Sequence, residues 1–93
     1  MTQFITRVEL HDGNPSDYDD LHEAMEMEGF WQTIKGESGK NYQLPTSEYL
    51  FVGPITIDEV YRKAYVATHS TRRAFGLVVT EANNISLHGL REA

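Results

Sequence analysis

The sequence predicts an α+β domain of the ferredoxin-like class, with βαββαβ order and two helices on one face of a four-stranded antiparallel sheet. Three observations predict it. The N-terminal segment alternates apolar and polar residues, as a strand with one buried face does. Two later segments combine N-capping signals with apolar residues at helical spacing. Short runs of aromatic and β-branched residues, bounded by turn residues, are typical of the other strands. We expect a single ferredoxin-like domain, 1–93.

The first predicted strand covers residues 4–11, and its alternate side chains lie on opposite faces of the sheet. Its even positions should face the helices: Phe4, Thr6, Val8 and Leu10. Its odd positions should lie on the open face: Ile5, Arg7, Glu9 and His11. A sheet covered by helices on one side leaves this open face free for a partner, a substrate or a second copy.

The first predicted helix follows Asn14-Pro15, with Ser16 as its N-cap, and ends at Gly29 in a left-handed cap. Aspartates in its first turns favour the positive end of the helix dipole. The buried stripe of this helix is expected at Tyr18, Leu21, Ala24 and Met25.

A hairpin is expected after the first helix. Residues 30–35 predict one strand, residues 36–39 a turn and residues 41–44 the returning strand. Pro45 interrupts the pairing, so the next strand, over 48–52, is expected to be offset.

The second predicted helix begins with a capping box formed by Thr56 and Glu59. A narrow stripe lets it lie close to the sheet: Ile57, Val60, Ala64 and Ala67. The last long strand covers 75–80, and 85–90 is expected to add a short edge strand. The right-handed crossover preference places the first and third strands at the centre of the sheet.

The third strand of the expected sheet is apolar on both faces, so two registers are open. In one register Tyr49 and Phe51 emerge on the open face near Ile5. In the other, Leu50 and Val52 do. Either register exposes a large apolar patch, which indicates a partner surface. We therefore expect a homodimer or another protein contact through these residues: Ile5, Trp31, Tyr49 and Phe51. The alternative is that loops or the C-terminal segment cover the patch.

Composition limits the function classes. The absence of cysteine excludes disulfides, thiolate catalysis and cysteine-based zinc sites. No apolar run approaches the roughly eighteen residues of a membrane span, and no signal peptide is visible, so we expect a cytoplasmic protein. Fourteen acidic against eight basic residues give a net charge of −6, the wrong sign for tight binding to a phosphate backbone. Any nucleic acid should approach the one basic cluster: Arg62, Lys63, Arg72 and Arg73.

Several motifs together resemble a domain family of small bacterial proteins. In the first half they are Arg7-Val8-Glu9-Leu10-His11, Asp17-Tyr18, Leu21-His22-Glu23-Ala24-Met25, Gly29-Phe30 and Thr33-Ile34. In the second half they are Tyr42-x-Leu44-Pro45-Thr46-x-Glu48-Tyr49 and Val78-Val79-Thr80-Glu81. The family is the one that includes the GhoS-type endoribonuclease antitoxins. The resemblance implies a ferredoxin-like fold, similar to the small CRISPR-associated nucleases, and cleavage of the messenger RNA of a toxin.

Four residues are candidates for RNA cleavage. His11 is the candidate acid or base because its ordinary pKa lies near neutrality, and His22 should approach the same corner from the first helix. Arg7 on the open face could hold a phosphate. Asp12 resembles, by position, the acidic residue that follows the first strand of the CRISPR-associated nucleases and helps to hold a divalent metal. The alternatives are a turn cap for His11 and Asp12, a half-exposed helix residue for His22, and an ion pair between Arg7 and Glu9.

Glu9 and Asp12, with His11 beside them, supply ligand types that suit a divalent metal such as magnesium, manganese or zinc. No strong metal-binding motif accompanies them, and no other cofactor is indicated. Two hypotheses stay open. The first is a small interaction protein, homodimeric through its open face and without catalysis. The second is an antitoxin that cleaves single-stranded RNA.

Overall fold

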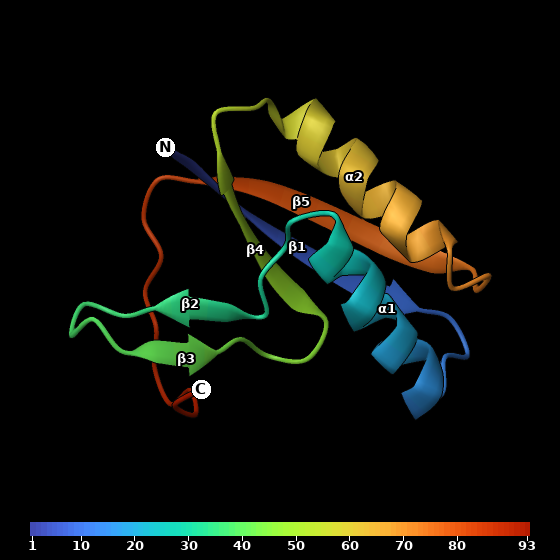
Figure 1. Cartoon of the computed structure of the whole chain (residues 1–93), viewed down its shortest axis with the longest axis horizontal. Coiled ribbons are helices and arrows are strands. Elements are labelled where there is room, and N and C mark those ends of the chain that lie inside the picture. The colour runs from blue at the N-terminus through green and yellow to red at the C-terminus, as the bar shows by residue number, and fades with distance from the viewer.

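Two helices lie across one face of an antiparallel sheet in the computed structural model, which describes residues 1–93 (Figure 1). The elements follow one another as β1 (Thr2–Leu10), α1 (Pro15–Met27), β2 (Thr33–Lys35), β3 (Asn41–Gln43), β4 (Glu48–Gly53), α2 (Ile57–His69) and β5 (Phe75–Ala82). The main sheet has the order β4-β1-β5, and β2 and β3 form a separate two-stranded sheet. The α+β class is therefore confirmed, with three strands in the main sheet.

The segment after α1 touches the main sheet at one point. Trp31 and Leu50 exchange two backbone hydrogen bonds of 2.8 Å, an isolated antiparallel bridge. Beyond it the chain turns away, and β2 pairs with β3 in a hairpin that projects from the side of the molecule (Figure 1). β1 is thus the central strand, and β4 has only this bridge along its outer edge.

β1 has the predicted alternation of buried and exposed side chains. Its even positions from Phe4 to Leu10 are buried beneath the helices, whereas Arg7 and Glu9 are exposed on the open face. This face also carries the partners of Arg7 in the register, Glu48 on β4 and Val78 on β5.

The start of α1 differs from the prediction. Asn14 is the N-cap, and its side chain accepts a hydrogen bond of 3.0 Å from the backbone N–H of Asp17. The Asp17 carboxylate accepts one from the backbone N–H of Asn14, also at 3.0 Å. Pro15 occupies the first helical turn, where its fixed φ and missing N–H are tolerated, so Ser16 already lies inside the helix. At the other end, Gly29 has the predicted positive φ, +94°.

α2 begins with the predicted capping box, in which the Thr56 side chain accepts from the backbone N–H of Glu59 at 3.2 Å. Three members of its predicted stripe are buried: Val60, Ala64 and Ala67. The fourth, Ile57, is the first residue of the helix and is 38% exposed. Neither helix, each 13 residues long, has the length and hydropathy of a membrane span.

The register of β4 decides which apolar side chains lie on the open face. Tyr49 is fully buried under the helices, and Phe51 packs into the same core. Leu50 and Val52 therefore emerge on the opposite side. The prediction that Tyr49 and Phe51 are partner-binding residues of the open face is wrong, because Tyr49 is fully buried and the partly buried Phe51 packs against the core beneath the helices.

The C-terminal segment, residues 83–93, covers part of the open face. Its apolar side chains pack against a second cluster formed by Ile34, Leu44 and Leu50, which also contacts Ile5. They are Ile85, Leu87 and Leu90. The predicted edge strand over 85–90 is absent. Instead, the chain end pairs with β3 through a bridge between Tyr42 and Glu92. The expected apolar patch is thus covered at its centre.

Candidate functional site

The end of β1 brings together three of the predicted site residues. His11 and Asp12 form the exposed turn between β1 and α1, where the His11 backbone N–H donates to the carbonyl of Ala74 at 2.7 Å. The His11 Nε2 lies 3.5 Å from a carboxylate oxygen of Glu9. Asp12 has a left-handed backbone, with φ at +59°, as short polar residues in turns do. Both residues therefore have a structural role in this turn.

Arg7 lies on the open face and pairs with β4. Its Nε is 3.8 Å from a carboxylate oxygen of Glu48, its partner in the strand register. The alternative pairing with Glu9 does not form. The Arg7 side chain is 75% exposed, so this ion pair contributes little to stability and leaves the guanidinium accessible.

His22 is brought into contact with a residue that the sequence had not linked to it. Its Nδ1 lies 2.6 Å from the hydroxyl of Tyr49, and the two ring centroids are 5.8 Å apart. Tyr49 is fully buried between α1 and the sheet, and its ring also packs edge-on against Phe30. The phenol of Tyr18 lies nearby and accepts a hydrogen bond of 3.1 Å from the backbone N–H of Leu10.

Burial sets the protonation of this pair. It lowers the pKa of His22, because the charged imidazolium loses hydration, and the nearby carboxylate of Asp19 opposes this only in part. Burial also raises the pKa of Tyr49, and the phenol of Tyr18 adds to this shift. Both side chains are therefore neutral at pH 7. Thr6 faces Tyr49 in the strand register, and its buried Oγ1 has no hydrogen-bond partner.

The four candidates for RNA cleavage are thus divided between two places. His11 contacts Glu9 at the exposed end of β1, whereas His22 contacts Tyr49 beneath α1. No hydrogen bond or ion pair joins His11 or Asp12 to His22. The structure also gathers no group of three or more histidine or acidic side chains at a spacing that fits a metal ion, so Glu9, His11 and Asp12 do not form such a group.

Two of the four residues of the predicted basic cluster are paired with carboxylates. Arg73 donates from Nε to Asp17 at 2.9 Å and ties the turn after α2 to the start of α1. Lys63 lies 4.0 Å from Glu28. Arg62 and Arg72 are exposed, and Arg72 has a left-handed backbone in the turn after α2. Arg62 and Arg72 are therefore the two members of the cluster without a carboxylate partner.

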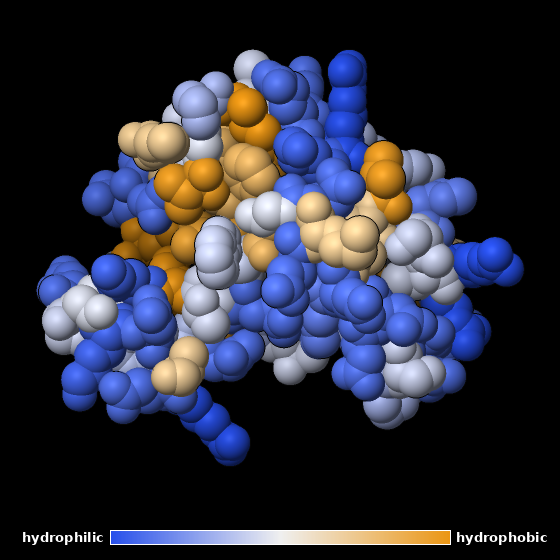
Figure 2. All heavy atoms as spheres, in the orientation of Figure 1, coloured by the Kyte–Doolittle hydropathy of each residue, from blue (hydrophilic) through white to orange (hydrophobic).

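Exposed apolar side chains remain at two places on the main sheet. In Figure 2 apolar atoms gather where β4 leads into α2, and this part of the chain exposes Val52 and Ile57. On the opposite edge of the sheet, β5 exposes Val78, which is 61% accessible. Trp31, the one predicted partner-binding residue that is well exposed, is 63% accessible.

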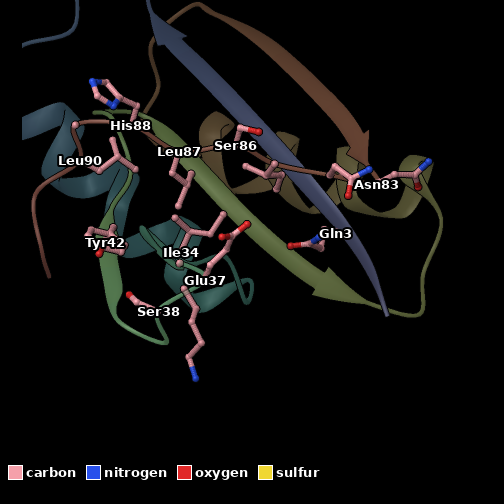
Figure 3. Close-up of a pocket in the computed structure, with 15 residues that line it drawn as sticks. Gln3, Ile34, Glu37, Ser38, Tyr42, Asn83, Ser86, Leu87, His88 and Leu90 are labelled. Atoms are coloured by element: carbon pink, nitrogen blue, oxygen red, sulfur yellow. The ribbon is translucent and has the colours of Figure 1, made fainter.

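A groove of about 730 Å³ lies on the open-face side, between the tip of the β2–β3 hairpin and residues 83–90 (Figure 3). Gln3 and Glu37 point toward one another from opposite sides of it, and Ile34 and Leu87 meet at its centre. Sequence reasoning missed this groove. The alternation of Ile85 and Leu87 indicates that one side of the C-terminal segment is buried. It does not show that the β2–β3 hairpin forms the other wall of the groove.

No protein-family model matches this chain, and no curated protein matches it either.

Proposed function

We propose that this chain is a small interaction protein that forms a homodimer through its main sheet, along β5, and does not act as a catalyst. The observation that carries the proposal is the free edge of β5. This strand pairs with β1 on one side and with no strand on the other. An unpaired edge presents backbone N–H and C=O groups that can pair with another strand.

β5 lacks the features that usually protect an edge strand. Its eight residues contain no lysine, arginine or proline, and Glu81 is their only charge. The exposed side chain at its middle, Val78, is apolar. Monomeric proteins commonly use a charge or a proline at such a position to prevent edge-to-edge association.

The strand is also compatible with two-fold symmetry. An axis perpendicular to the sheet at Val78 pairs this residue with its own copy and pairs Leu77 with Val79 of the second chain. Opposed residues in an antiparallel pair share a face, so the exposed valines meet on the open face. Leu77 and Val79 extend the apolar side that faces the helices in each chain.

α2 lies beside β5 and adds aromatic surface to the proposed interface. Tyr65 packs edge-on against Phe75 at a centroid distance of 5.3 Å and is still 44% exposed. Tyr61, at 6.0 Å from Tyr65, is 45% exposed. Tyrosine is enriched in protein interfaces because it combines a large apolar ring with a polar hydroxyl. Most of the acidic residues of the two helices lie on α1, not on α2 beside β5.

We also propose the finer classification as a ferredoxin-like fold and the cytoplasm as the location. The bridge between Trp31 and Leu50 supports the first, because it puts the chain after α1 along the outer edge of β4. A fourth strand of a ferredoxin-like sheet occupies that position.

Sedimentation equilibrium at micromolar concentration tests the proposal. The protein should have about twice its chain mass of 10.6 kDa. Val78→Lys should shift it to monomer, because two ammonium groups would face one another at the axis. Val66→Lys is the matched control, since Val66 on α2 is also 61% exposed. A monomeric wild type, or a dimer that Val78→Lys leaves intact, contradicts the proposal.

An RNA cleavage assay tests the alternative that the protein is an antitoxin endoribonuclease. Incubation with a defined single-stranded RNA should leave the RNA intact. Cleavage that disappears in His11→Ala and Asp12→Ala, with both variants folded, would replace our proposal with an endoribonuclease.

A further inference from the structure

The groove between the hairpin and the C-terminal segment has backbone groups available on both walls. On the hairpin wall, Gly36 N–H donates to the Lys40 carbonyl at 2.8 Å, and Leu44 N–H donates to the Gln32 carbonyl at 2.9 Å. Residues 32, 34 and 36 therefore direct their backbone groups toward β3. Strand geometry alternates, so the N–H and C=O of Lys35 point away from β3. Lys35 is also one of the residues that line the groove.

The opposite wall is more unusual. Residues 83–90 cross the open face but belong to no strand, and their backbone groups make no hydrogen bond within the chain. Hydrogen bonding to β3 resumes only at the chain end, where Arg91 accepts from Gln43 at 2.8 Å and Ala93 donates to Asn41 at 2.9 Å. The segment is thus fixed at both ends, by β5 and by β3. Its backbone donors and acceptors are left for solvent or a ligand.

Side chains in the groove define what it would accept. Gln3 and Asn83 project amides, which both donate and accept hydrogen bonds, as a peptide group does (Figure 3). Ile34 and Leu87 provide an apolar contact at the centre. Lys35 and Glu37 carry opposite charges, so the groove has no strong preference for an anion or a cation.

We propose that this groove binds an extended, uncharged peptide segment of a partner protein. The peptide pairs its main chain with the free edge at Lys35 and with residues 83–90, and it places one apolar side chain against the partly exposed Leu87, which packs over Ile34. Main-chain hydrogen bonds supply affinity in this mode, and the apolar contact supplies selectivity. The site is separate from the β5 edge, so it does not depend on the proposed dimer.

A capped peptide that alternates threonine and valine is a suitable probe, titrated into the ¹⁵N-labelled full chain and followed by amide NMR shifts. The amides of Lys35 and of residues 83–90 should shift, while those of α2 should not. The same peptide N-methylated at alternate residues should bind about tenfold more weakly, because it cannot form the main-chain bonds.

Two variants locate the contact. Lys35→Pro removes the N–H that points away from β3 and should weaken binding, whereas Lys35→Ala keeps that N–H and should bind as the wild type does. Equal binding of the methylated and unmethylated peptides overturns the proposal, whatever the folding of the proline variant. So does the absence of shifts at Lys35 and 83–90 at millimolar peptide. Shifts of these amides with protein concentration alone would instead assign the groove to a second copy.

Discussion

The contact between His22 and Tyr49 makes a quantitative prediction about stability. Tyr49→Phe removes the hydroxyl that lies 2.6 Å from His22 Nδ1 and keeps the ring that packs against Phe30. A neutral hydrogen bond contributes about 0.5–1.5 kcal/mol net. His22 is only partly buried, so water can replace the lost partner. We therefore expect a loss of about 1 kcal/mol in the free energy of unfolding, not the larger cost of an orphaned buried group.

Urea denaturation at pH 7.5, followed by circular dichroism, measures this loss. Tyr42→Phe is the control, because Tyr42 lies on β3, away from the β5 edge, and its hydroxyl makes no hydrogen bond within the chain and is not among the buried unpaired atoms. That variant should stay within about 0.5 kcal/mol of the wild type. If Tyr49→Phe costs no more than Tyr42→Phe, the hydrogen bond contributes nothing and our description of the buried pair is refuted.

Two further predictions concern the same part of the core. Burial lowers the native pKa of His22, so below pH 6.5, the ordinary pKa of histidine, the unfolded chain binds a proton at His22 that the native state does not. The free energy of unfolding should therefore fall as the pH decreases from 6.5 to that native pKa. His22→Gln should reduce this pH dependence in urea titrations at several pH values. An unchanged pH dependence in His22→Gln would show that other groups cause it. Thr6→Val replaces a buried hydroxyl that has no hydrogen-bond partner with a methyl group of similar shape, so it should raise the midpoint of thermal unfolding and add about 1 kcal/mol of stability. A destabilised Thr6→Val would mean that the hydroxyl is hydrogen-bonded in solution.

Patterns among neighbouring residues were enough to predict the buried face of the first strand and most helix ends. Alternation identified the buried face of β1, and the spacing of Thr56 and Glu59 identified the start of α2. Gly29 marked the end of α1 because glycine, without a Cβ, readily adopts the positive φ of a left-handed cap. The N-cap of α1 was misassigned because Pro15 fits the first helical turn, which moves the cap back to Asn14.

Contacts between distant residues were beyond local patterns. β4 is apolar on both faces, so only the packing of the helices decides that Tyr49 is buried and Leu50 lies on the open face. His22 and Tyr49 are 27 positions apart, and no spacing rule links them. The C-terminal segment covers the open face because Ile85 and Leu87 find apolar partners on the hairpin and β4, a long-range fit that alternation alone does not identify.

The mass of the protein in solution tests the central claim most directly. Sedimentation equilibrium of the wild type beside Val78→Lys and Val66→Lys should give a dimer, a monomer and a dimer, respectively. A wild type that sediments at the chain mass of 10.6 kDa throughout the micromolar range would contradict an interface along β5.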